Sequence, residues 1–204
     1  MRLDRFLDLA GPSVHALTRR NAERRRALFS DPPAPGRVVF LGDSITAGGL
    51  WDELFPDLPT LNRGIGGDTT FDVLARLDGA INQPRAVSLL IGTNDLHAHR
   101  RFRDIHGISE RTEELIGRIR ARAPGVPVLL NSVTPRTTFH TERISRLNDL
   151  NRGVGSRTGA TYVDLWPVLA DAVGELRSEL TLDHLHLTAP GYRAWAEVLR
   201  PHLG

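Results

Sequence analysis

The sequence predicts an α/β fold built on a parallel sheet. Four apolar segments have the length and composition of strands, at residues 38–41, 86–91, 126–130 and 161–163. The first three are continuously apolar, which is typical of strands covered by helices on both faces. Helical patterns lie between them. The alternation of strands with helices favours parallel strands joined by right-handed crossovers.

Residues 1–36 precede the first strand and predict one or two amphipathic helices. Leu3, Phe6 and Leu7 share a face there, and the segment SDPPAPG at 30–36 predicts a short linker. We therefore expect a helical N-terminal extension over 1–36, followed by one domain over 37–204.

The remaining elements follow in order along the chain. A weaker strand is expected at 60–62, between the first two strong ones. Residues 108–119 place apolar side chains at helical spacing, and the Pro-Gly pair at 124–125 ends that run. Residues 192–199 repeat the i, i+3, i+4, i+7 spacing behind Pro190, which predicts a C-terminal helix.

Composition excludes several classes of protein. The chain has 204 residues, 40% apolar and 25% charged, and a net charge of +2, values typical of a globular domain. No apolar window reaches the roughly 18 to 20 residues of a membrane span, and the N-terminus lacks a signal-peptide core. We expect a cytoplasmic protein without stable membrane insertion. The absence of cysteine excludes disulfides, thiolate catalysis and cysteine-bound metals.

Basic residues do not predict nucleic-acid binding. All 26 of them are arginines, and along most of the chain they alternate with acids, as on a solvated surface. One dense cluster lies at residues 19–26, without the interleaved aromatic residues of a single-strand-binding groove. It is interpreted either as the outer face of a helix or as a site for an anionic partner or membrane surface. The N-terminal helices could also pack on a second copy, so a homo-oligomer stays open.

Chemically active residue types follow the predicted strands. Gly-Asp-Ser follows the first strand at 42–44, RGIGGDTT follows the weak second strand at 63–70, and GTND follows the next at 92–95. DHLH at 183–186 precedes the C-terminal helix. Ligands bind outside the carboxyl ends of parallel strands, so these four blocks predict one site.

The residues in these blocks suit nucleophilic catalysis. A serine hydroxyl such as that of Ser44 needs a neighbouring base, and His186 can be that base. Asp183, three residues earlier, could accept the other imidazole N–H and fix the tautomer. The developing oxyanion needs donors. Candidates are the N–H of Ser44, the N–H of Gly67 and the side-chain amide of Asn94.

Each block also has a purely structural interpretation. Ser44 could be a helix N-cap, and Asn94 with the following aspartate could form an Asx turn. The glycines at 64–67 could form only a tight turn, with Asp68 capping the next helix; we expect that capping role for Asp68. His186 alone could be structural. The structural account needs four coincidences, whereas one catalytic site explains all four blocks.

The four blocks resemble those of the SGNH, or GDSL-type, family of serine esterases and lipases. GDSI matches the nucleophile block, NRGIGGDTT the second block, GTND the third and DHLH the last, over about residues 38–199. The GIGGDTT phrase resembles the branch that includes platelet-activating-factor acetylhydrolase catalytic subunits and their bacterial relatives. The resemblance implies a flavodoxin-like α/β/α sandwich with five parallel strands in the order 2-1-3-4-5.

The resemblance also implies a reaction and roles. It implies ester hydrolysis by Ser44, His186 and Asp183, with Ser44, Gly67 and Asn94 as the oxyanion hole, and no metal or organic cofactor. The substrate is expected to be a small-molecule ester with a short, acetyl-type acyl group on a small alcohol, sugar or lipid. Lysophospholipase or thioesterase activity of the same family is the alternative.

Several further residues are candidates for the substrate pocket. Asp43, His97 and Leu187 lie within or directly after the four blocks and could line it. Trp51 and Phe71 could supply an apolar wall, with core packing as the alternative for both.

Other functions explain the blocks less well. A dinuclear metallophosphoesterase needs an upstream Asp-x-His that is missing at the required place. The glycine spacing of GIGGDT is incomplete for dinucleotide binding, and no G-x-S-x-G nucleophile elbow surrounds any serine. A binding or scaffolding module without catalysis would be indicated by a broken set of blocks, whereas all four are present.

Overall fold

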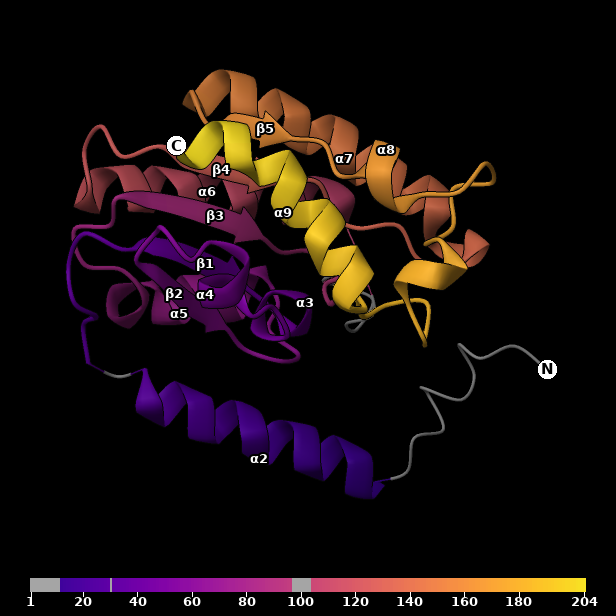
Figure 1. Cartoon of the computed structure of the whole chain (residues 1–204), viewed down its shortest axis with the longest axis horizontal. Helices are drawn as coiled ribbons and strands as arrows, with labels where there is room; N and C mark the ends of the chain where they lie inside the picture. The colour runs from indigo at the N-terminus through magenta and orange to yellow at the C-terminus, as the bar shows by residue number, and fades with distance from the viewer. Residues whose placement is uncertain (1–11, 30, 97–103) are drawn as a thin grey trace.

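A computed structural model describes residues 12–29, 31–96 and 104–204, and these form a parallel sheet flanked by helices (Figure 1). In chain order the elements are α2 (Pro12–Leu28), β1 (Val38–Gly42), α3 (Ser44–Ala47), α4 (Trp51–Leu54), β2 (Thr60–Gly64), α5 (Thr70–Ala80), β3 (Ala86–Leu90), α6 (Ile105–Arg122), β4 (Val128–Asn131), α7 (Thr138–Thr158), β5 (Thr161–Val163), α8 (Trp166–Leu169), the 3₁₀ turn η2 (Ser178–Leu180) and α9 (Ala189–Leu203).

The sheet has five strands in the order β2-β1-β3-β4-β5, and every pair is parallel. This order confirms the predicted fold class. In the register Gly42 pairs with both Gly64 and Leu90, so β1, β2 and β3 end at the same level. Three of the four sequence blocks therefore leave the sheet at one edge.

Alternate side chains of β1 pack into two separate cores, one on each face of the sheet. Phe40 points to the face covered by α4, α8 and α9, where its ring stacks on Trp51 with centroids 3.9 Å apart. Val39 and Leu41 point to the opposite face, which α5 and α6 cover. Coverage on both faces explains why these strands read as continuous apolar runs. Figure 1 shows α9 crossing in front of the sheet.

The expected strands and helices are found with shifted ends. The second strand continues to Gly64, two residues beyond its expected end, and β4 begins at Val128 rather than at residue 126. Helices α6 and α9 lie where the apolar spacing predicts them. Leu3, Phe6 and Leu7, on which the expected N-terminal face depends, lie outside the described residues.

Helix α7 is the longest described element that the sequence analysis did not predict. Its buried face carries His140, Asn148 and Asn151 beside Ile144 and Leu147, so its apolar periodicity is weak. Asn148 uses both ends of its amide on the backbone of Val133, at 2.8 and 2.9 Å. Polar residues on the buried face thus hide this helix from a hydrophobicity pattern.

Over the part of the chain that the structure describes, no helix is both long and apolar enough to span a membrane.

Candidate active site

Ser44 lies where strand β1 gives way to helix α3. Asp43 is the N-cap of that helix, and its Oδ1 accepts a hydrogen bond from the N–H of Ile45 at 2.9 Å. A Cβ on Gly42 would lie 2.1 Å from the carbonyl oxygen of Leu90, so only glycine fits between the two strand ends. This tight passage holds the Ser44 hydroxyl at the carboxyl edge of the sheet.

His186 reaches Ser44 from the loop that precedes α9. Its Nε2 lies 2.9 Å from Ser44 Oγ, although 142 residues separate the two along the chain. Its Nδ1 lies 2.6 Å from Oδ2 of Asp183. The other carboxylate oxygen accepts the N–H of Leu185 at 3.0 Å and that of His186 at 2.7 Å. The structure thus brings together the three side chains predicted to act together.

The contacts around His186 set the direction of the hydrogen bonds. An ionised carboxylate only accepts, so Nδ1 donates to Asp183 and Nε2 is left to accept the hydroxyl proton of Ser44. Partial burial acts to raise the pKa of Asp183, but hydrogen bonds from the His186 ring and backbone outweigh it and leave that pKa below its ordinary value. Asp183 is therefore ionised at neutral pH and can stabilise an imidazolium.

The block after β2 forms a tight turn beside Ser44. The N–H of Asp68 donates to the carbonyl oxygen of Ile65 at 3.2 Å, and Gly67 has a φ of +83° at the third position, as in a type II turn. A side chain at Gly67 would strain this conformation. A Cβ on Gly66 would lie 3.7 Å from Cβ of Ser44, which places the turn against the serine.

Asn94 follows β3 and joins the same cluster. Its Nδ2 donates to the carbonyl oxygen of Asp68 at 2.9 Å, which fixes the amide against the end of the Gly67 turn. A carboxamide nitrogen carries two hydrogens, so one remains for a further acceptor. All three predicted donor positions, Ser44, Gly67 and Asn94, therefore lie at one edge of the sheet.

The predicted capping role of Asp68 is wrong. The N-cap of α5 is Thr69, which forms a capping box with Asp72. The carboxylate of Asp68 is fully buried and pairs with Arg76, whose Nε lies 2.6 Å away, and with Nη2 of Arg26 from α2. Two guanidinium groups compensate its burial, that of Arg76 on the following helix and that of Arg26, which is 42 residues away in the chain.

Asp95 has a structural role next to Asn94. Its buried carboxylate accepts the backbone N–H of Thr70 at 3.0 Å and the Thr70 hydroxyl at 2.6 Å, and Arg111 lies at 3.5 Å. Burial raises the pKa of Asp95, while the hydrogen bonds from Thr70 and the charge of Arg111 act against that rise. Asp95 thus ties the start of α5 to the end of β3.

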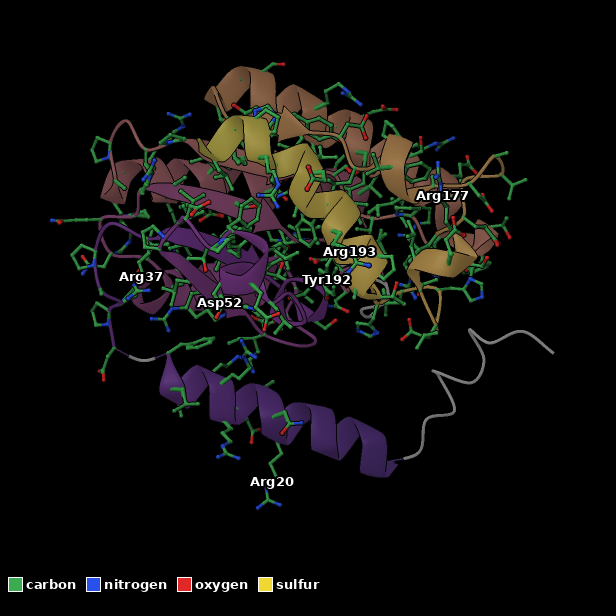
Figure 2. All side chains as sticks on the ribbon, viewed as in Figure 1. Arg20, Arg37, Asp52, Arg177, Tyr192 and Arg193 are labelled. Carbon is green, nitrogen blue, oxygen red and sulfur yellow. The ribbon has the colours of Figure 1, made fainter. Side chains whose placement is uncertain are left out.

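Two side chains that the sequence analysis missed hold helix α3. Asn62 donates to the carbonyl oxygens of residues 46, 47 and 49 at 3.0–3.1 Å, which satisfies the open end of this short helix. The hydroxyl of Tyr192 donates to the Ile45 carbonyl at 2.7 Å, and Figure 2 labels Tyr192 at the end of α9 nearest α3. A polar residue ending a predicted strand was the available signal for Asn62.

The structure corrects the prediction that Asp43 lines the substrate pocket. The side chain is fully buried and caps α3, so it cannot touch a substrate directly. Burial raises the pKa of Asp43 to about 7 against the opposing hydrogen bond from Ile45, and the charges of Asp68 and Asp95 add to the rise. Its contribution is to the stability of the loop that carries Ser44.

This burial predicts a pH dependence of stability that Asp43→Asn should reduce. An unfolded aspartate loses its proton near pH 3.9, whereas folded Asp43 keeps it up to about pH 7. The folded state binds the extra proton in this window, so the free energy of unfolding falls as pH rises from about 4 to 7. Each unit of difference in pKa is worth about 1.4 kcal/mol.

Urea unfolding of both proteins at pH 4 to 8 measures this effect. Asparagine keeps the oxygen that accepts the Ile45 N–H but does not titrate, so the curve of the variant should decline less with pH. Parallel curves for the two proteins would show that Asp43 is ionised throughout.

The structure places the other pocket candidates in different environments. His97 lies outside the described residues. Trp51 is buried in the core against Phe40 and Trp195, whereas Phe71 is 44% exposed. Leu187 lines an open groove of about 390 Å³. The other residues of that groove are Gly48, Leu50, Glu53, Leu54, Ala189, Tyr192 and Arg193.

The chain is similar in sequence to known proteins. Residues 40–194 match the model of the GDSL-like lipase/acylhydrolase family. Over 166 residues the chain is 32% identical to platelet-activating factor acetylhydrolase IB subunit alpha1 of Bos taurus, and the match covers 76% of this chain and 69% of that protein.

Solved structures share the whole architecture. One is a Streptococcus pneumonia protein provisionally described as a platelet activating factor, with a TM-score of 0.81, 25% identity and coverage of 98% of this chain and 99% of that chain. The acetyl xylan esterase AlAXEase shares the fold with a TM-score of 0.69 and 21% identity, over 82% of this chain and 100% of the esterase chain.

Proposed function

We propose, since the chain belongs to the GDSL-like lipase/acylhydrolase family and is a carboxylic ester hydrolase, that Ser44, His186 and Asp183 are its catalytic triad. The observation that carries this proposal is the 2.9 Å contact between His186 Nε2 and Ser44 Oγ, with Asp183 at 2.6 Å on the opposite ring nitrogen. Nucleophile, base and orienting carboxylate are within hydrogen-bonding reach in the order that acyl transfer requires.

Acylation begins with attack of Ser44 Oγ on the ester carbonyl carbon. The hydroxyl proton passes to Nε2 of His186, and the imidazolium is stabilised by Asp183. The carbonyl oxygen becomes an oxyanion, which accepts hydrogen bonds from the N–H groups of Ser44 and Gly67 and the free amide hydrogen of Asn94. The C–O bond to the alcohol then breaks, and His186 protonates the leaving oxygen.

Deacylation repeats these steps with water as the nucleophile. Nε2 of His186 takes a proton from the water, whose oxygen attacks the acyl-serine carbonyl. The second tetrahedral oxyanion uses the same donors. When the bond to Ser44 Oγ breaks, His186 returns a proton to Ser44, and the carboxylic acid leaves.

We infer short acyl esters as the preferred substrates. The side chains of His186 and Asp183 are 45% and 38% exposed, so the triad lies at the surface, where a long acyl chain next to it would stay in water. The bovine relative is named as an acetylhydrolase, which agrees with a small acyl group. No step of the proposed reaction requires a metal or organic cofactor.

A lysophospholipase-type activity on longer acyl chains is the second candidate, and the groove beside the site favours it. This groove of about 390 Å³ begins at Leu187, next to His186, and its apolar wall includes Leu50, whose side chain is 60% exposed. If an acyl chain lies in this groove, each buried methylene contributes about 0.8 kcal/mol.

A chain-length series of para-nitrophenyl esters separates the two candidates. For the short-acyl enzyme, we expect kcat/KM to be highest for acetate to butyrate and not to rise with further methylenes. For the second candidate, 0.8 kcal/mol per methylene predicts a rise of about four-fold for each one. Leu50→Ala is the matched variant: it should reduce such a rise if the groove holds the chain and leave acetate hydrolysis unchanged.

A further inference from the structure

We propose that helix α2 contributes to the active site through Arg26, a positioning residue that holds the Gly67 turn in place by its bond to Asp68. The proposal rests on the proposed function, because it concerns the donors assigned there to the oxyanion. It gives a specific role to one arginine of the basic cluster at residues 19–26, for which the sequence left two interpretations open.

Helix α2 lies apart from the sheet and reaches it at few points. Figure 1 shows α2 as a separate helix below the sheet and the helices that flank it. The guanidinium of Arg26 donates through Nη2 to Oδ1 of Asp68, and the same nitrogen lies 3.4 Å from Oδ1 of Asp72. Nearby, the guanidinium of Arg63 lies 4.4 Å above the ring of Phe29.

The backbone of Asp68 is linked to two predicted oxyanion donors, Gly67 and Asn94. It directly follows Gly67, and its N–H closes the turn on Ile65 at 3.2 Å. Its carbonyl oxygen accepts the side-chain amide of Asn94 at 2.9 Å. A shift of Asp68 would therefore move the N–H of Gly67 and the amide of Asn94 together. Misplacement by about 1 Å costs up to about a hundred-fold in rate.

The carboxylate of Asp68 is held by one arginine on each oxygen. Arg76 donates through Nε to Oδ2 at 2.6 Å, and its Nη2 donates to the carbonyl oxygen of Gly42 at 3.1 Å, which ties Asp68 to the strand end before Ser44. Arg26 is the partner of Oδ1. Burial raises the pKa of Asp68, and the charges of Arg76 and Arg26 act against that rise.

Loss of Arg26 would leave Oδ1 of the fully buried Asp68 carboxylate without its partner. The side chain of Asp68 has no exposed surface, whereas that of Arg26 is 39% exposed. An unpaired buried oxygen is costly, so Asp68 is expected to turn toward water or take up a proton, and either change moves its backbone. The domain keeps its core without Arg26, because neither apolar cluster of the sheet includes α2.

The test compares Arg26→Ala with Arg24→Ala in the full chain, using para-nitrophenyl acetate. Arg24 lies on the same helix and is exposed, so its removal changes the charge equally without touching Asp68. At a temperature where both proteins are fully folded, we expect kcat of Arg26→Ala to fall about ten-fold with KM within two-fold of wild type. The melting temperature should fall, because one oxygen of the buried Asp68 carboxylate loses its partner. Arg24→Ala should match wild type in all three.

Rescue distinguishes positioning from a general structural effect. Guanidinium ion at millimolar concentration can occupy the space left in Arg26→Ala, and it should restore part of kcat without affecting wild type. Equal kcat values for Arg26→Ala and wild type would overturn the proposal. It would also be overturned if kcat fell only near the melting temperature of the variant and guanidinium ion restored none of it. An inactive wild-type protein would instead contradict the proposed function itself.

Discussion

Replacing Ser44 by alanine is expected to remove ester hydrolysis almost completely. We expect kcat/KM on para-nitrophenyl acetate to fall by at least a thousand-fold, because the proposed nucleophile, whose Oγ lies 2.9 Å from Nε2 of His186, is removed. The oxyanion donors stay in place in this variant, so a small residual rate over water can persist. Since the Ser44 hydroxyl donates only to His186, its loss should leave the melting temperature nearly unchanged.

A fluorophosphonate probe supplies an independent measurement of the same residue. Wild-type protein should be labelled once per chain, and Ser44→Ala should not be labelled. Ser156→Ala is the matched control, since Ser156 is exposed on α7 and its hydroxyl donates only to the carbonyl of Arg152 at 3.2 Å. Retained hydrolysis or labelling in Ser44→Ala would mean that another nucleophile carries the reaction.

The α/β fold class could be predicted from the residues because the central strands are buried on both faces, whereas the strand order was implied only by the resemblance to the SGNH family. Apolar runs such as residues 38–41 and 86–91 need no partner information to be recognised, and the helices between them fix the parallel sense. The ends of the strands could not be predicted as well. Gly42 and Gly64 belong to strands because they pair across the sheet, and pairing is not visible in a single segment.

The site was predictable where its residues form compact blocks. Ser44, Gly67 and Asn94 each follow a strand, so the strand order brings three of the four blocks near one edge, and Asp183 and His186 are only three residues apart in the fourth. The groups that hold these blocks were not predictable. They act through contacts between separate segments, which no local spacing indicates: Arg26 with Asp68, Asn62 with the backbone after Ser44, Arg76 with Gly42, and Tyr192 with Ile45.

The two errors on aspartates have a common cause. Asp68 and Asp43 both precede short polar segments at helix starts, and the sequence predicted a cap for the first and a pocket residue for the second. The structure gives the cap to Thr69 in one case and to Asp43 in the other. Burial decides between these roles, because a fully buried carboxylate requires internal partners before it can serve a substrate.

Replacing Asn94 by alanine is expected to have the second-largest effect on catalysis. One amide hydrogen of Asn94 holds the carbonyl of Asp68 at 2.9 Å, so the amide is fixed before substrate arrives and its second hydrogen can meet the oxyanion. Loss of a pre-oriented donor costs about a hundred- to a thousand-fold in kcat, equivalent to about 3 to 4 kcal/mol of transition-state stabilisation. KM should change little, because the charge develops only in the transition state.

Asn82→Ala is the control for the loss of a hydrogen bond from an asparagine side chain to a backbone carbonyl. Asn82 also donates through Nδ2 to a backbone carbonyl, that of Pro33 at 2.9 Å, but it lies in the connection before β3, away from the blocks of the site. We expect kcat of Asn82→Ala to equal that of wild type. A raised KM with normal kcat in Asn94→Ala would make the amide a ground-state binding group. The oxyanion would then depend on the N–H groups of Ser44 and Gly67 alone, and the role of Asp68 as a shared anchor would reduce to holding Gly67.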